Sequence, residues 1–238
     1  MATMPSRASF YNQLLAVCVV LMACFALPYP WNRFASIGYL LLAGVLIRGL
    51  GHPSADLPLP RAWRRGFPAL GVTAVGFWLL WTFTPLQMRS TGIPVIVFWT
   101  VFGGWSAVLL IRMLARERQV TGSVLKGALA GYLMLGLAAG LLLCGLETIQ
   151  PESFSGIAIE PPAEGHGLTV WGMNFARLNY FAFVSLTTMG YGDVVPRTPA
   201  ASMICVMVAI AGTFYIATVM GILISRLTIQ DSEQPPNS

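Results

Sequence analysis

Long apolar runs separated by short polar segments dominate the pattern along this chain. Runs long enough to cross the roughly 30 Å hydrocarbon core of a bilayer recur along its length. They lie at residues 12–27, 34–50, 67–83, 93–113, 124–146 and 200–227. The pattern therefore predicts an all-α membrane protein with six transmembrane helices.

The segment between the fifth and sixth runs departs from this pattern. Residues 148–168 contain several prolines and glycines, which predict an irregular loop. Residues 174–187 then have the length of a helix that is too short to cross the bilayer, and a polar, glycine-containing strand follows. Non-helical backbone at membrane depth survives only where protein buries it or where it lines a water-filled path. We therefore expect a re-entrant pore helix followed by a strand that lines a pore.

Composition and charge agree with a membrane protein and orient it. The 238 residues are 56% hydrophobic and 10% charged, which is too apolar for a soluble domain. Ten of the 14 basic residues fall on one predicted face, which the positive-inside rule makes cytoplasmic. The ten are Arg7, Arg48, Arg61, Arg64, Arg65, Arg112, Arg116, Arg118, Lys126 and Arg226. We expect both termini in the cytoplasm of a cell-membrane protein, contacts with lipids, and no binding of nucleic acid.

The polar strand carries the candidate chemistry. Its sequence Thr188-Met189-Gly190-Tyr191-Gly192 resembles the selectivity filter of potassium channels, whose usual form is Thr-Val-Gly-Tyr-Gly. The chain is similar to bacterial-type, six-span channels with one pore loop and no charged voltage sensor. Successive carbonyls point one way only if the backbone alternates between left- and right-handed dihedrals, which glycine reaches at low cost. Gly190 and Gly192 stand at alternate positions, as this requires.

The resemblance implies how the strand would act. The carbonyls of Thr188, Met189, Gly190 and Tyr191 would coordinate dehydrated K⁺, and the Thr188 hydroxyl would complete the innermost site. The chain has one pore loop and such a ring takes four, so we expect a homotetramer with K⁺ as the permeant ion and no cofactor. By the same resemblance, the residues that support the filter are Thr187, Gly192, Asp193, Tyr180 and Phe181.

Three positions depart from the usual family pattern. Tyr180 and Phe181 stand where many relatives carry two adjacent tryptophans. Val184 stands where some relatives pair a glutamate with the filter aspartate, so we expect the Tyr180 hydroxyl to be the partner of Asp193. Met189 replaces the customary valine without removing a ligand, although its flexible thioether packs less stiffly behind the strand.

Glycines in the last two spans suggest close helix contacts. Gly212 lies near the middle of the last span, where a hinge and close packing are equally good interpretations. Ile216 and Met220 follow about one turn apart and are candidates for an apolar gate. The Gly-x-x-x-Gly pairs at 127–131 and 136–140 permit tight contact with the last span or with a neighbouring subunit.

The first four runs, which we call the front-half helices, form a predicted domain at residues 1–121, and the pore domain covers 122–238. A voltage sensor needs arginines at every third position within the membrane, because each charge contributes only about 2.3 kcal/mol per 100 mV. The fourth run has no charge between Ile93 and Ile111. We therefore expect a scaffold or a lipid-facing role for the front-half helices.

Passive potassium conduction is the function that these features favour. A weakly selective cation channel, suggested by Met189 and the altered pore-helix aromatics, and a non-conducting regulatory subunit are the alternatives. An enzyme is not expected, because no nucleophile, base and orienting group occur together. The four cysteines all fall inside predicted spans, so we expect no disulfide and no structural metal site.

Overall fold

The computed structural model describes residues 7–27, 31, 34–51, 61–83, 89–117, 120–157 and 175–233. Within these residues the regular secondary structure is helical apart from two short strands that pair with each other. The first five helices are α1 (Arg7–Phe25), α2 (Phe34–Leu50), α3 (Arg61–Phe83), α4 (Arg89–Leu114) and α5 (Gly122–Ile149). They are followed by β1 (Phe154–Ser155), α6 (Phe175–Leu186), β2 (Val195–Pro196), α7 (Pro199–Tyr215), the π-helical turn η3 (Ile216–Met220) and α8 (Gly221–Glu233).

Each predicted span coincides with a helix, and the last span is built from α7, η3 and α8 in one continuous run. Among the described residues, four helical segments are long and apolar enough to cross a membrane. These are Arg7–Phe25, Gly92–Leu114, Gly122–Ile149 and Pro199–Ile229. Helix α2 and the apolar part of α3, Gly66–Leu80, are shorter. The helical architecture is thus confirmed, while the count of six crossings stays a prediction.

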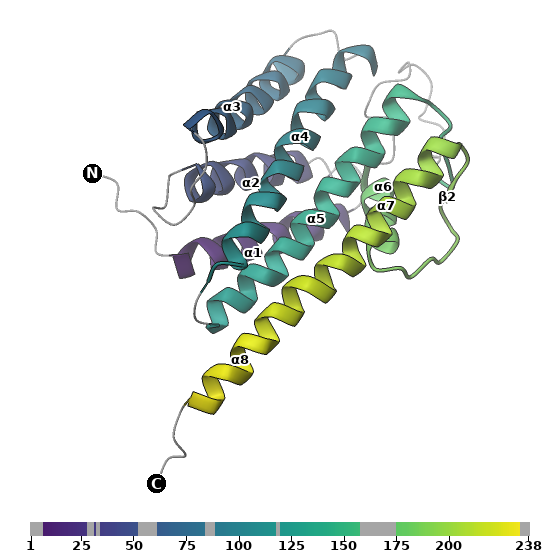
Figure 1. The fold of residues 1–238 in the computed structure, drawn as a ribbon. Helices are drawn as coiled ribbons and strands as arrows, with labels where there is room; N and C mark the ends of the chain where they lie inside the picture. The colour runs from purple at the N-terminus through teal and green to yellow at the C-terminus, as the bar shows by residue number, and fades with distance from the viewer. Residues whose placement is uncertain are drawn as a thin grey trace.

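Helix α5 is the common wall of the molecule, because α1, α4, α6 and α7 all pack on it (Figure 1). The larger buried apolar cluster joins α1, α2, α3, α4 and α5, and it also includes Tyr215, Val219 and Leu223 of the last span. A second cluster joins the C-terminal half of α5 to α6, to Val194 and to α7. The front-half helices and the pore region therefore share one supporting helix, whose first residue coincides with the predicted domain boundary.

The two Gly-x-x-x-Gly pairs of α5 allow this close packing. At each of the four glycines, an added Cβ would come too close to a side chain from another helix of the same chain. The contacts are Gly127 with Tyr11 of α1, Gly131 with Tyr215 of α7, Gly136 with Phe183 of α6 and Gly140 with Asn179 of α6. The glycines thus serve packing within the chain, and one of the four contacts is with the last span, as expected.

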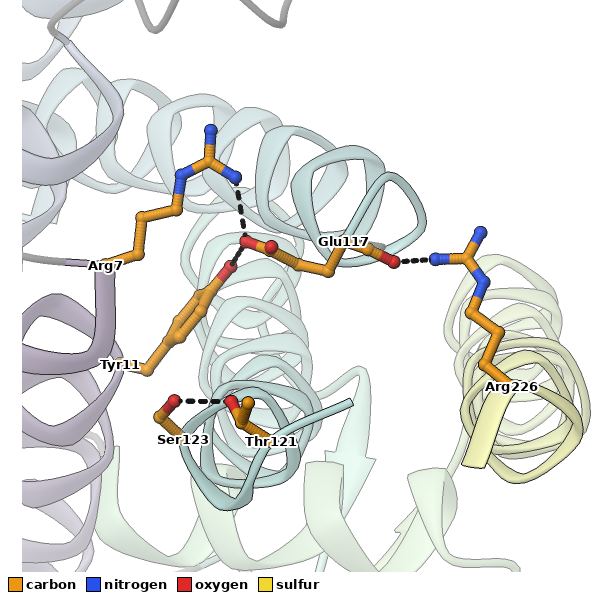
Figure 2. A network of polar contacts seen from close by, with 6 residues as sticks. All are labelled: Arg7, Tyr11, Glu117, Thr121, Ser123 and Arg226. Atoms are coloured by element: carbon orange, nitrogen blue, oxygen red, sulfur yellow. Dashed lines mark hydrogen bonds and ion pairs between the residues drawn. The ribbon is translucent and has the colours of Figure 1, made fainter. Parts of the chain in front are cut away.

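Helix α8 extends past the other helices (Figure 1). Its Arg226 contacts the link between α4 and α5. Arg226 donates hydrogen bonds to the carbonyls of Ala115, at 2.8 Å, and of Glu117. The Glu117 carboxylate accepts from Arg7 at 3.0 Å and from Tyr11 at 2.9 Å, both on α1 (Figure 2). One residue of the link therefore joins the start of α1 to the end of the last span.

Gly212 packs against the C-terminal end of α6. A Cβ at this position would overlap the carbonyl oxygen of Leu186. The Tyr132 hydroxyl of α5 donates to the same carbonyl at 3.4 Å. Of the two interpretations of Gly212, this contact favours close packing, because any larger residue would push α7 away from α6.

The irregular geometry of the last span lies just beyond Gly212. The turn η3 begins at Ile216 and ends at Met220, the two residues predicted to form a gate. Immediately before it, the Tyr215 hydroxyl donates to the Ala128 carbonyl of α5 at 2.6 Å. Insertions of the π type are one of the recognised origins of helix bends. The structure thus places a candidate hinge after the Tyr215 anchor, and the gating role of Ile216 and Met220 stays a prediction.

The Gly212 contact gives a first prediction. We expect Gly212→Ala to lower the free energy of unfolding by about 1–3 kcal/mol, because its methyl group would overlap backbone that cannot easily yield. Gly221→Ala is the matched control, since a Cβ there meets no described atom within 4 Å. Thermal unfolding in detergent would measure both. Equal stability of the two variants would show that α7 and α6 are not in close contact at Gly212.

Candidate functional site

The candidate site is the extended segment after α6, residues 188–192, which we call the filter strand after its predicted role. It begins with an unusual helix end. The Thr188 amide donates to the Ser185 carbonyl at 3.1 Å, and the Met189 amide donates to the Val184 carbonyl at 3.0 Å. This is the hydrogen-bond pattern of a Schellman motif, which places a left-handed residue just after the helix. Thr188 occupies that position with φ +58°. A left-handed conformation costs a residue with a Cβ roughly 1–2 kcal/mol, so packing around the strand has to maintain it.

Left-handed residues then recur at every second position of the strand. After Thr188, Gly190 has φ +59° and Gly192 has φ +77°. A Cβ at either glycine would meet no described atom within 4 Å, so the positive φ and not crowding accounts for glycine there. The alternation at the two glycines was expected from the sequence, whereas Thr188 was not, because threonine rarely adopts this conformation.

The pairing of β1 with β2 fixes the C-terminal end of the filter strand. Strands β1 and β2 pair antiparallel, with Phe154 opposite Pro196. The Arg197 amide donates to the Ser153 carbonyl at 2.7 Å, and the side chain of Val194 is buried. The residues after the filter are therefore fixed to the segment that leaves α5.

Glu147, near the C-terminus of α5, holds that segment in turn. Its side chain is buried, and its carboxylate accepts hydrogen bonds from the amides of Glu152 at 2.9 Å and of Phe154 at 3.2 Å. A buried carboxylate is retained only with such partners. Sequence reasoning did not assign this role to Glu147. The available signal was its position inside the last turn of an apolar helix.

Asp193, at the outer end of the filter, is contacted by two residues of α6. Tyr180 interacts electrostatically with this carboxylate, and the hydrogen bond between the two that the sequence predicts stays a prediction. The Arg177 guanidinium lies 3.6 Å from the same carboxylate. Sequence reasoning missed Arg177, although it stands three residues before Tyr180 and so shares its helix face.

The other two predicted support residues pack within the chain. Phe181 is buried, and its ring meets that of Phe154 edge-on at a centroid distance of 5.8 Å. Thr187 donates its hydroxyl to the Phe183 carbonyl at 2.7 Å and so closes the end of α6. The structure thus places Phe181 against β1, and its predicted role beside the filter tyrosine stays a prediction.

The filter strand and one stripe of α7 are open in the single chain. The side chains of Met189 and Tyr191 are 59% and 66% exposed. The exposed apolar residues of α7 recur at helical spacing along one stripe. They are Met203, Val206, Met207, Ile210 and Phe214. Contiguous apolar surface of this kind indicates contact with lipid or with another protein surface.

The same part of the chain resembles known channels. Residues 153–229, about a third of the chain, match the family described as ion channel. A relative among curated proteins is "Potassium channel subfamily K member 1" of Oryctolagus cuniculus, which is 27% identical over 93 residues. That alignment covers 36% of this chain and 27% of the length of the relative. No solved structure matches the chain.

The family match falls on the segment that contains α6, the filter strand and α7. Together with the four long apolar helices, the two matches make this chain similar to membrane-embedded ion channels, a potassium channel among them. Both likenesses are to channel proteins. The ligand role of each filter residue stays a prediction.

The left-handed Thr188 gives a second prediction. We expect Thr188→Gly to raise the free energy of unfolding by about 1 kcal/mol, because glycine adopts this φ without steric cost. Thr188→Ala also removes the hydroxyl but retains a Cβ, so it should not stabilise the fold. Thermal unfolding in detergent compares the two variants. If glycine is no better than alanine, the left-handed conformation at residue 188 is not strained.

The buried Glu147 gives a third prediction. In Glu147→Gln, one carboxylate oxygen becomes an NH₂ group, which cannot accept a hydrogen bond from either amide. We expect a loss of about 1–3 kcal/mol of stability and faster amide hydrogen exchange at residues 152–157. Glu152→Gln, at an exposed position nearby, is the control. Unchanged exchange in Glu147→Gln would mean that its carboxylate does not anchor this segment.

Proposed function

We propose that this chain is one subunit of a potassium-selective channel that conducts K⁺ passively across the cell membrane. The observation that carries the proposal is the alternation of left-handed residues at Thr188, Gly190 and Gly192, inside the segment that matches the ion-channel family. The carbonyls of residues 188–191 would replace the hydration shell of the ion. The Thr188 hydroxyl would add a ligand at the inner end.

The working unit in this proposal is a homotetramer. One strand offers carbonyls from one side only, whereas a dehydrated cation needs oxygen ligands all around it. Four copies about a shared axis supply such a ring, and closed rotational symmetry is the usual arrangement of identical subunits. The exposed side chains of the filter strand and the apolar stripe of α7 support this assignment, since both offer surface to neighbouring copies.

The subunit would cross the membrane six times, with both termini in the cytoplasm and α6 re-entrant. Helix α6 has 12 residues, which span about 18 Å and cannot cross a hydrocarbon core of roughly 30 Å. Its C-terminus leads directly into the filter, so the negative end of its dipole would favour a cation on the inner side. Conduction would not be controlled by voltage through α4, which carries no charge from Ile93 to Ile111.

A weakly selective cation channel is the second candidate, and Met189 favours it. Its flexible side chain is 59% exposed in the single chain, at the position where the usual filter has a stiff valine. A filter supported less firmly from behind would discriminate less between K⁺ and Na⁺. Reversal potentials measured with K⁺ on one side and Na⁺ on the other separate the two functions, because only a selective pore gives a potential far from zero.

Ion flux gives a fourth prediction. We expect the purified protein in liposomes to take up rubidium, a K⁺ substitute, and barium to block the uptake. Gly190→Ala should reduce uptake by more than about tenfold, because the left-handed cost of roughly 1–2 kcal/mol arises in every subunit. Gly104→Ala, on α4, is the control, since a Cβ there meets no described atom within 4 Å.

Two results would contradict this proposal. Wild-type protein that is folded and correctly inserted but takes up no rubidium is not a channel of this kind. Equal uptake by wild-type protein and Gly190→Ala would show that the filter strand is not the conduction path.

A further inference from the structure

A buried polar contact joins a front-half helix to the helix that precedes the filter. The Tyr39 hydroxyl of α2 donates a hydrogen bond to the Asn179 Oδ1 of α6 at 3.2 Å. The two residues are 7% and 1% exposed. Asn179 uses its other amide atom as well, because Nδ2 donates to the Phe175 carbonyl at 2.9 Å. The Asn179 amide is thus paired at both ends in surroundings that offer it no water.

Aromatic rings from α1, α4 and α6 surround the ring of Tyr39. The ring centroid of Tyr39 lies 5.7 Å from Trp99 of α4 and 6.3 Å from Phe25 of α1. Phe175, at the start of α6, lies 6.0 Å from Tyr39 and 5.8 Å from Phe25. The rings therefore hold the Tyr39 hydroxyl in one place relative to α6.

Helix α5 closes the site from another side. A Cβ at Gly140 would overlap the Asn179 amide oxygen and lie 2.6 Å from the amide carbon. The amide consequently fills the space between α5 and α2, and this packing restricts how far it can turn away from Tyr39 while α6 stays in place. The Tyr39–Asn179 hydrogen bond therefore depends on the orientation of α6 as a whole.

The same helix contacts the filter through neighbouring residues. Phe175 and Asn179 stand four residues apart, on the face toward the front-half helices. Arg177 and Tyr180 stand three residues apart, on the face that meets Asp193. A rotation of α6 that broke the Tyr39 contact would therefore also shift the residues that hold the outer end of the filter.

We propose that Tyr39 is a positioning residue for the filter, and that the front-half helices set the orientation of α6 through the Tyr39–Asn179 hydrogen bond. This rests on the proposed channel function. It assigns the front-half helices a role in ion selection and in the stability of the conducting state, in place of the voltage sensing that their lack of charge argues against. The partner of the interaction is within the same chain.

Tyr39→Phe tests the proposal, because it removes one oxygen and keeps the ring contacts. We expect the ratio of conducting to non-conducting states, measured in single-channel recordings, to fall by about threefold for each of the four subunits, the typical effect of one interhelical hydrogen bond in a membrane. The K⁺ over Na⁺ permeability ratio should fall with it. Tyr11→Phe is the matched control for ion selection: it removes a front-half hydroxyl that binds Glu117, away from α6, and should leave the permeability ratio unchanged.

A double-mutant cycle with Asn179→Leu separates positioning from simple loss of stability. If both residues act through one hydrogen bond, Tyr39→Phe/Asn179→Leu should conduct no worse than either single variant. The double variant also leaves neither polar atom of the pair unpaired, so it should fold if a single variant does not. Effects of the single variants that add in the double variant would overturn the proposal, as would wild-type permeability ratios in all three.

A readout that needs no conduction distinguishes failure of this proposal from failure of the proposed function. Amide hydrogen exchange at residues 187–194, measured by mass spectrometry in detergent, should be about threefold faster in Tyr39→Phe than in wild-type protein and unchanged in Tyr11→Phe. Unchanged exchange in Tyr39→Phe overturns the positioning role even if the wild-type protein conducts. Faster exchange in a protein that does not conduct supports the mechanical link and contradicts only the channel function.

Discussion

Backbone that makes no helical hydrogen bonds has to be held by its neighbours when it lies at membrane depth, and the proposed position of the filter strand would impose this requirement on the rest of the fold. At the inner end of the filter strand, α6 finishes in a Schellman motif, and Leu186 is packed against Gly212 of α7. At its outer end, β2 pairs with β1, and the buried Glu147 binds the amides next to β1. Helix α5 carries contacts to both ends, which explains why it is the common wall of the structure.

Of the three left-handed residues in the filter strand, Thr188 is the one with a side chain, so the conformational cost falls on that residue. Glycine would satisfy the left-handed position after α6 at no cost, yet the chain has Thr188 there, with φ +58°. Strained positions of this kind persist where the surroundings determine them and where function needs the side chain. The hydroxyl of Thr188, which glycine lacks, is the group that the proposed inner K⁺ site would use. The residue with the strained backbone is thus the one whose side chain the proposed function uses.

The front-half helices contact the pore region at two levels. Near the filter, Tyr39 binds Asn179 inside a group of aromatic rings. At the opposite end of the last span, Glu117 in the α4–α5 link binds Arg7 of α1 through its carboxylate and Arg226 of α8 through its carbonyl (Figure 2). Movement of the front-half helices would therefore be transmitted by packing and hydrogen bonds. No movement of charge through the membrane field is needed for this.

The sequence by itself determined the helical membrane architecture, the positions of the helices and the glycine spacing of the filter, because these follow from local hydropathy and from the dihedral freedom of single residues. It also indicated that Tyr180 interacts with Asp193. It could not assign Glu147, Asn179 or Tyr39, since each is an ordinary polar residue whose partner lies on another segment of the chain. Only the tertiary structure decided those pairings. The energy of a buried hydrogen bond depends on which segments of the chain pack together and exclude water. A one-dimensional pattern of residues does not contain that information.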